Sequence, residues 1–447
     1  MRTKEPQYQI CFSEKIIFSL FIYYLAIDPI LHLVNAYFFK GELFKLPTPL
    51  DIISLELIIF IATLFLIISR TISIKKYLNF GTTYTLFLFV WIFFIIIVSF
   101  YDVIEVEKTN FWKYNYHFRL IICQGFIFIM LGLNVHLIND LFQIKKYKFI
   151  FYAVTIFYFA IILSSSILNP LSALYPWYLC GITGGIYGSD AFVDCLYISD
   201  TVALLLFIII SRAKNINIKI LIILSGAFLI YLSGSRATLV FFIVSALIVL
   251  TIKILPLSIK EKLVFVAVLI ILLYISIINI GLVELPAQYS ETHRFRFNLY
   301  GILNDQSYIE RGILLGTGLR ELEEHWFLGR YMSEVIEGRP GTYIHNWLSF
   351  WSAFGLVPFL FFIFMIIFVM YRISILFIND LNSPIKEFLF LCSIFMIMSI
   401  CFARAYTYHF IWFILSAVPM ISHRFERNLK LRREGAITLF RHQNRGR

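Results

Sequence analysis

Several segments of this chain are apolar on every side, and this feature limits its fold more than any other. The stretches 263–280 and 359–370 contain no charged residue. Helices in soluble cores keep one polar face, whereas helices that face lipid are apolar all round. Strands of a membrane barrel would instead alternate residue by residue. With 60% hydrophobic and only 15% charged residues, the sequence predicts an all-α polytopic membrane protein.

The apolar segments also predict how many times the chain crosses the membrane. Windows of about 20 residues give about twelve transmembrane helices. The first is long enough to span and lacks a small-residue cleavage site after it, so we expect an anchor and not a cleaved signal peptide. Two pairs have short connections and are expected to form tight helical hairpins. The segments lie near 16–38, 51–69, 82–100, 118–138, 149–168, 193–211, 217–233, 237–252, 263–283, 347–371, 387–402 and 405–422, the hairpins being the seventh with the eighth and the last two.

Basic residues in alternate loops predict the orientation. Lys75, Lys145, Lys214 and Lys260 represent four such loops, and the tail 423–447 is rich in arginine. Cytoplasmic loops carry the excess of Lys and Arg, so both termini are expected in the cytoplasm. The net charge of +11 therefore reports mainly orientation, and we expect no nucleic-acid partner.

The predicted organisation is four consecutive parts. Residues 1–283 form transmembrane helices 1–9, 284–346 form one large external loop, 347–422 form helices 10–12, and 423–447 form a basic cytoplasmic tail. The glycines at 312, 316 and 318 in the loop predict two short helices around a turn. The loop is rich in arginine, which indicates either an anionic partner or salt bridges within the loop.

The first candidate site residue is Arg236, which stands between two hydrophobic segments at the outer membrane boundary. An arginine at such a place marks a ligand or a buried partner. Its planar guanidinium offers a fork that suits pyrophosphate oxygens. An arginine that reaches for lipid phosphate would give the same pattern, so both interpretations stay open.

A second group lies in the external loop. Arg294 and Arg296 precede Tyr300, and on a helix Arg296 and Tyr300 would share one face. Two arginines beside an aromatic ring suit a phosphate and a sugar. An amphipathic helix at the membrane surface would look similar.

The third candidate is His345, followed by Asn346 directly before a predicted span. A histidine here could take the proton of a sugar hydroxyl or hold the hydroxyl by a hydrogen bond, although a lone histidine at an interface is more often structural. Arg404 lies in the last tight hairpin. The predicted topology places Arg236, Arg296, His345 and Arg404 at the same outer surface, although they come from four distant stretches.

Other polar residues leave alternatives open. The acids Asp28, Glu56, Asp194 and Asp200 lie within or beside spans and could be counter-ions or sugar contacts. The six cysteines show no metal-ligand spacing, so no metal site is expected. Cys180 and Cys195 flank one external loop, where a disulfide and two unrelated thiols are both open.

In their order and spacing, these motifs resemble the superfamily of O-antigen polymerases and O-antigen ligases, which assemble bacterial envelope polysaccharide. The resemblance covers roughly 220–420. No acidic residue stands at 347–349, where many family members have one, so the resemblance implies a hydrogen-bonding role for His345 more than a charge relay. The matching residues are Ser235-Arg236-Ala237-Thr238-Leu239 entering a helix, Arg296 with Tyr300, a Gly316-Thr317-Gly318 turn, His345-Asn346 before a helix, and Ala403-Arg404-Ala405.

The resemblance implies a glycosyltransferase of lipopolysaccharide biosynthesis in the bacterial inner membrane, with its active face in the periplasm. It implies metal-independent, inverting transfer from an undecaprenyl-diphosphate-linked oligosaccharide, without a cofactor. Membrane lipid and a chain-length regulator are the other expected partners. The expected catalytic residues are Arg236, Arg296 and His345, and the expected substrate-binding residues are Arg294, Tyr300, Asn346 and Arg404.

Two functions fit this resemblance, and a third comes from a competing class. A polymerase, which joins lipid-linked repeat units, is favoured by the divergent sequence rich in Ile and Phe. An O-antigen ligase would instead use the outer core of lipid A as the acceptor. A flippase or transporter for the same lipid-linked sugar also needs many spans and cationic residues, but transporters usually hold their substrate near the midplane between repeated halves. No internal repeat is apparent in this chain.

Overall fold

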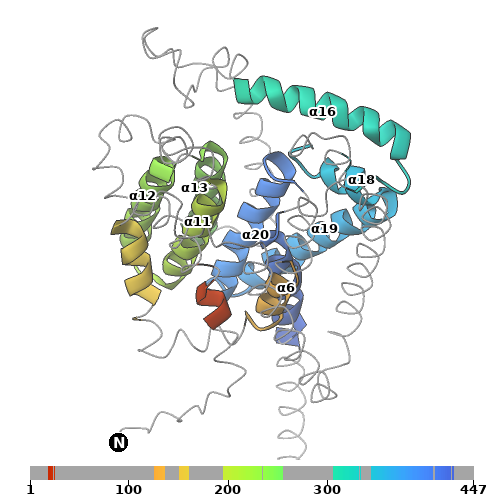
Figure 1. Ribbon diagram of the computed structural model, residues 1–447. Coiled ribbons are helices and arrows are strands. Elements are labelled where there is room, and N and C mark those ends of the chain that lie inside the picture. The colour runs from red at the N-terminus through yellow and green to blue at the C-terminus, as the bar shows by residue number, and fades with distance from the viewer. Residues whose placement is uncertain are drawn as a thin grey trace, which may run out of the picture. The chain divides into compact units, whose positions relative to one another are not determined.

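The computed structural model of the 447-residue chain describes residues 19–23, 25, 125–135, 149, 151–160, 195–233, 235–254, 306–331, 333, 344–405, 408–423 and 425–426. These residues form helices and connecting turns, with no strand among them (Figure 1). Two shorter apolar helices, Phe151–Ala160 and Phe410–His423, carry no label. The labelled helices are α6 (Gly125–Leu133), α11 (Cys195–Arg212), α12 (Ile216–Ser233), α13 (Arg236–Ile254), α16 (Gln306–His325), α18 (Leu348–Phe354), α19 (Leu356–Ile378) and α20 (Pro384–Phe402).

Four of these helices are long and apolar enough to cross a membrane. They are α12, α13 from Ala237 onward, α19 and α20. The expectation of an all-α membrane protein is met at this level. The expected spans at 51–69, 82–100 and 263–283 lie outside the described residues, so the count of about twelve stays a prediction.

The chain divides into two compact units. Unit 1 contains α12 and most of α11, and unit 2 contains α6, α16, α18, α19, α20 and most of α13. Unit 1 comprises Met1–Arg70, Asn134–Ile209 and Lys214–Thr238, and unit 2 comprises Thr71–Leu133, Ile210–Ala213 and Leu239–Arg447.

The connection between α12 and α13 is as short as the sequence predicts. The first helix ends at Ser233 and the second begins at Arg236. Ser235 stands at the N-cap position of α13, and its Oγ accepts a hydrogen bond of 3.4 Å from the backbone N–H of Thr238. This bond satisfies one of the N–H groups that the first turn of a helix leaves without a helical partner.

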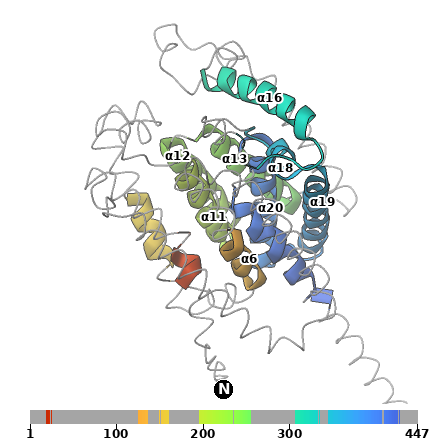
Figure 2. The same ribbon diagram turned by 45° about the vertical axis from the view of Figure 1, so that its right-hand side comes forward.

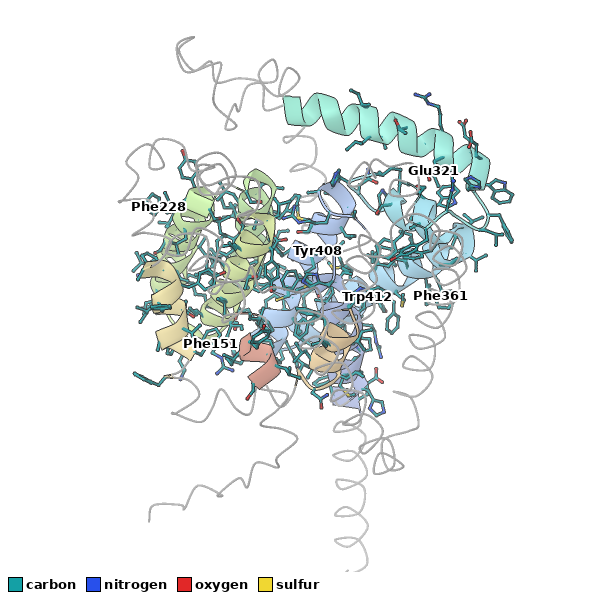
Figure 3. All side chains as sticks on the ribbon, in the orientation of Figure 1. Phe151, Phe228, Glu321, Phe361, Tyr408 and Trp412 are labelled. Carbon is teal, nitrogen blue, oxygen red and sulfur yellow. The ribbon has the colours of Figure 1, made fainter. Side chains whose placement is uncertain are left out.

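In unit 2, α6 packs closely against the helix Phe410–His423. A Cβ added at Gly132 would overlap Ser416, and one added at Gly125 would lie 3.2 Å from the indole of Trp412, which Figure 3 labels. The residue numbers of these contacts increase together, from Gly125 with Trp412 to Gly132 with Ser416, so the two helices are parallel. Because glycine has no side chain, Gly125 and Gly132 allow the backbones of the two helices to approach each other.

A buried ion pair joins the end of α13 to the start of α20. Lys253 Nζ lies 2.5 Å from Glu387 Oε2, and the Glu387 side chain is only 1% exposed. Next to it in sequence, Lys386 pairs with Asp380 at 2.9 Å and lies 4.2 Å above the ring of Phe425. The C-terminal end of α13 and the N-terminal end of α20 therefore lie together within unit 2.

The predicted continuous span 347–371 is wrong, because the helix breaks at Gly355, where φ is 84°. In an unbroken helix the N–H of Leu356 would bond the carbonyl of Ser352. Instead Leu356 N donates to Phe327 O at 3.1 Å, and Ser352 O accepts from Arg330 N at 2.7 Å. Backbone groups of the turn after α16 therefore take the place of the missing helical hydrogen bond, and α18 and α19 are separate helices.

The predicted turn between two short helices in the external loop is also wrong. α16 is one continuous helix that runs through Gly312, Gly316 and Gly318. Gly318 is needed for packing, since a Cβ there would overlap the side chain of Ile344. Gly312 and Gly316 have nothing within 4 Å of an added Cβ. The glycine at position 318 therefore allows Ile344 to pack closely against α16, and it does not mark a turn of the chain.

Candidate functional site

The turn that carries Arg236 is held on its α12 side by a serine pair. Ser199 Oγ of α11 lies 2.5 Å from Ser233 Oγ, the last residue of α12. Ser233 gives its own hydroxyl proton to the carbonyl of Ile230 at 2.8 Å. A hydroxyl has only one proton, so Ser199 is the donor in the serine pair.

The α13 side of the same turn is held by a carboxylate. Thr238 Oγ1 donates to Asp200 Oδ1 at 2.5 Å and lies 2.7 Å from Ser235 Oγ. Because the Thr238 proton goes to Asp200, Ser235 is the donor to Thr238. The result is a directed chain of hydrogen bonds that runs from Ser235 through Thr238 to Asp200.

The five side chains of this polar brace, Ser199, Asp200, Ser233, Ser235 and Thr238, are at most 1% exposed. Two consecutive residues of α11 thus fix both ends of the two-residue turn. Hydrogen bonds in such a dry environment are stronger than in water, and an unpaired group there would be destabilising. The brace therefore gives the turn a defined geometry.

Arg236 is the first residue of α13 and stands between the two braced residues Ser235 and Thr238. The structure describes its backbone, and its side chain lies outside the description. The start of a helix carries N–H groups without a helical partner and the positive end of the helix dipole. An arginine at this position adds to a site that already favours an anion.

His345 and Asn346 lie at the entrance to α18, in unit 2. The carboxamide oxygen of Asn346 accepts the backbone N–H of Leu348 at 2.9 Å. This oxygen is thus used to start the helix, so a substrate contact by Asn346 would involve its amide nitrogen. His345 is half-buried, directly after the buried Ile344 that packs on Gly318.

Arg404 follows α20 in a turn where the backbone N–H groups of Ala403 and Arg404 both donate to Ser399 O. Its side chain is only 7% exposed. The guanidinium lies 5.9 Å from the ring centroid of Tyr408, which Figure 3 labels. The guanidinium also donates to the carbonyl of Ala403 at 3.4 Å, so it is enclosed by protein at this turn.

The remaining predicted residues are not brought together by the described structure. Arg294, Arg296 and Tyr300 lie outside the described residues. Arg236 belongs to unit 1, whereas His345, Asn346 and Arg404 belong to unit 2. Across the described ranges, no group of three or more His, Cys, Asp or Glu residues has the arrangement of a metal site.

The sequence did not assign the residues of the brace. The sequence allows Asp200 to be a counter-ion or a sugar contact, and the structure shows that its carboxylate accepts a hydrogen bond from Thr238. An acid inside an apolar segment was the signal for Asp200. Ser235, a favoured N-cap residue shortly before an apolar run, is the signal for the cap. Nothing in the sequence marked Ser199 as the partner of Ser233.

Comparison with known protein families finds no family model that matches this chain, and comparison with curated proteins finds no significant match. A helix N-terminus that begins with an arginine, and whose turn is fixed by a buried brace, can bind and stabilise a negatively charged oxygen group.

Proposed function

We propose that this protein is an O-antigen polymerase that joins undecaprenyl-diphosphate-linked repeat units at the periplasmic face of the bacterial inner membrane. The proposal rests on the motif resemblance and on the braced turn at Arg236. Four long apolar helices support a location in a membrane. The resemblance supports the substrate class and the metal-independent chemistry.

In the proposed reaction, a hydroxyl of the acceptor repeat unit attacks C1 of the sugar on the donor lipid. The new bond joins the acceptor oxygen to C1, and the bond from C1 to the phosphate oxygen breaks. Attack from the opposite face inverts the configuration at C1. The electron pair leaves with undecaprenyl diphosphate, and the acceptor proton passes to His345 or through it to solvent.

Arginines supply the stabilisation that this leaving group needs. Negative charge develops on the diphosphate in a site of lowered dielectric, where fixed guanidinium groups act strongly. We assign Arg236 and Arg296 to the diphosphate, with Arg294 and Arg404 in support. Tyr300 and Asn346 are assigned to the sugar.

The observation that carries this proposal is the polar brace around Arg236. A surface arginine that only touches lipid headgroups needs no defined backbone geometry. Here Ser199 and Asp200 fix the turn on both sides through hydrogen bonds of 2.5 Å each. Catalysis by preorganised charge requires such rigidity, because the charge must already be in place when the transition state forms.

The decisive test supplies the purified full-length protein with one lipid-linked repeat unit in the presence of a metal chelator. A polymerase releases undecaprenyl diphosphate and builds a ladder of longer lipid-linked chains. A ligase stays silent until lipid A–core is added. Silence in both mixtures, with movement of the lipid-linked sugar across the vesicle membrane, would reject glycosyl transfer and favour a flippase.

A further inference from the structure

The turn after α16 presents three large apolar side chains. Trp326, Phe327 and Leu328, which we call the aromatic turn, are 52%, 53% and 65% exposed. The outer face of α16 just before it is charged, with Arg320, Glu323 and Glu324 exposed. An exposed apolar cluster with a charged border is typical of a surface that meets another phase or partner.

Hydrogen bonds fix the aromatic turn beside the first residue of α19. Phe327 O accepts the N–H of Leu356, and Trp326 O accepts the indole N–H of Trp351 at 2.6 Å. Gly329 and Gly355, with φ of 72° and 84°, let the two backbones touch, since a Cβ on either would overlap the other segment. The turn therefore cannot move along the axis of α19 without breaking these contacts.

The position of α19 sets the depth of the turn in a membrane. This helix has 23 residues, which at about 1.5 Å per residue matches the ~30 Å hydrocarbon thickness of a bilayer. Leu356 begins the helix, so the aromatic turn lies at the level where α19 enters the bilayer. In Figures 1 and 2, α16 runs across the end of unit 2 at which α18 lies.

One continuous exposed face leads from the turn down α19. Its side chains recur at intervals of three and four residues, which places them in a single stripe, and each is more than half exposed. Such a stripe on a spanning helix is the face that meets lipid. The stripe consists of Val357, Leu360, Phe364, Ile367 and Tyr371.

The chemistry of the turn matches the boundary between lipid chains and headgroups. Tryptophan is enriched at that level because its ring is apolar and its N–H is polar. Trp326, Trp347 and Trp351 all lie at this end of α19 and are three of the seven tryptophans in the chain. Trp351 stacks on Phe359 with ring centroids 5.4 Å apart.

We propose that the aromatic turn is a membrane anchor, which inserts at the headgroup boundary of the bilayer and holds the C-terminal end of α16 on the membrane surface. Glu321, which Figure 3 labels, also fixes α16 to α18, because its carboxylate accepts a hydrogen bond of 3.3 Å from the hydroxyl of Ser352. The bilayer is favoured over a protein partner because the turn continues directly into the lipid-facing stripe. This inference does not depend on the proposed enzymatic function.

The test uses tryptophan fluorescence of the full-length protein in phosphatidylethanolamine–phosphatidylglycerol vesicles. Subtracting the spectrum of Trp326→Phe from that of the wild type isolates the emission of Trp326. Lipids that carry bromine on acyl-chain carbons close to the headgroup should quench most of this emission. Acrylamide added to the aqueous phase should quench little of it. The matched variant Glu324→Trp, on the charged outer face, should add emission with the opposite sensitivity.

Two results would overturn the anchor. Quenching of Trp326 by acrylamide and not by brominated lipid would place the turn in water. Protection from both quenchers would mean that protein covers the turn, as in an interface with a second chain. Neither result involves turnover, so failure of the anchor is distinct from failure of the polymerase.

Discussion

Asp200 of α11 and Thr238 of α13 share a buried hydrogen bond of 2.5 Å although they lie 38 positions apart in the sequence. Replacing Thr238 by Val keeps its shape and removes the donor to Asp200 and the acceptor for Ser235. We expect the free energy of unfolding to fall by about 1–3 kcal/mol. Thr238→Ser keeps the hydroxyl and should lose much less. Thermal unfolding of the full chain in detergent measures both, and equal stability of Thr238→Val and wild type would contradict the role of the brace.

Arg236 should be required for product and not for stability. Arg236→Ala and Arg296→Ala are each expected to lower turnover by about 100-fold or more, with normal amounts of protein in the membrane. Arg236→Lys should be nearly as poor, because lysine lacks the bidentate fork. Arg330→Ala is the control, since its backbone contact to Ser352 survives. Similar losses at all three positions would indicate a general electrostatic or folding effect.

The glycines of α16 should respond differently to alanine. Gly312→Ala and Gly316→Ala add a methyl group in open space and should stabilise the helix by about 0.5–1 kcal/mol each. Gly318→Ala would press on Ile344 and should destabilise by about 1–3 kcal/mol. Hydrogen exchange across α16 separates the two cases. Destabilisation at all three positions would show that the region is not a continuous helix.

The pair formed by Lys253 and Glu387 should be more sensitive to single than to double replacement. Lys253→Met leaves Glu387 buried without its cation, which is expected to destabilise by about 3–5 kcal/mol. Adding Glu387→Met removes the stranded charge and should restore most of that loss. Urea or thermal unfolding of the single and double variants completes the cycle. Additive losses would indicate that the two side chains do not interact.

The orientation is tested by reporter fusions. A fusion after Lys262 should report the cytoplasm, and one within 321–338 should report the periplasm, because positively charged loops stay inside. Two reporters distinguish the two sides, because alkaline phosphatase is active only in the periplasm and a fluorescent protein of the green type fluoresces only in the cytoplasm. The same compartment at both positions would remove the basis for grouping Arg236 with His345.

Sequence patterns predict helix boundaries best where residues within the helix and directly beside it determine them. The ends of α12 and α13 can be predicted from the apolar runs that are interrupted at Gly234-Ser235. The break at Gly355 could not be read in the same way, because it depends on hydrogen bonds to Phe327 and Arg330 from a distant turn. The prediction of a turn at the glycines of α16 is wrong for a related reason. Gly318 is required by its contact with Ile344, which is distant in sequence, and not by a turn of the chain.

The candidate site shows the same division. Arg236 was found from its own position, as a charged residue where apolar residues dominate. The residues that fix it were not found, because Ser199 and Ser233 are ordinary serines until the fold makes them neighbours. The polar brace is a tertiary feature: the sequence marks Asp200 as an acid in an apolar segment and Ser235 as a cap, but it does not show which residues they meet.

The ion pair at the base of α13 and α20 has a consequence for how the chain is made. Lys253 and Glu387 are separated by 134 positions, and a ribosome completes the first long before it reaches the second. During that interval the lysine has no carboxylate to pair with, so its side chain must stay in contact with water or headgroups. Only nascent chains that extend past Glu387, in the first turn of α20, can form this pair. A chain truncated before Glu387 therefore leaves Lys253 without this partner, so the two helices are joined at these ends only after most of the chain has been made.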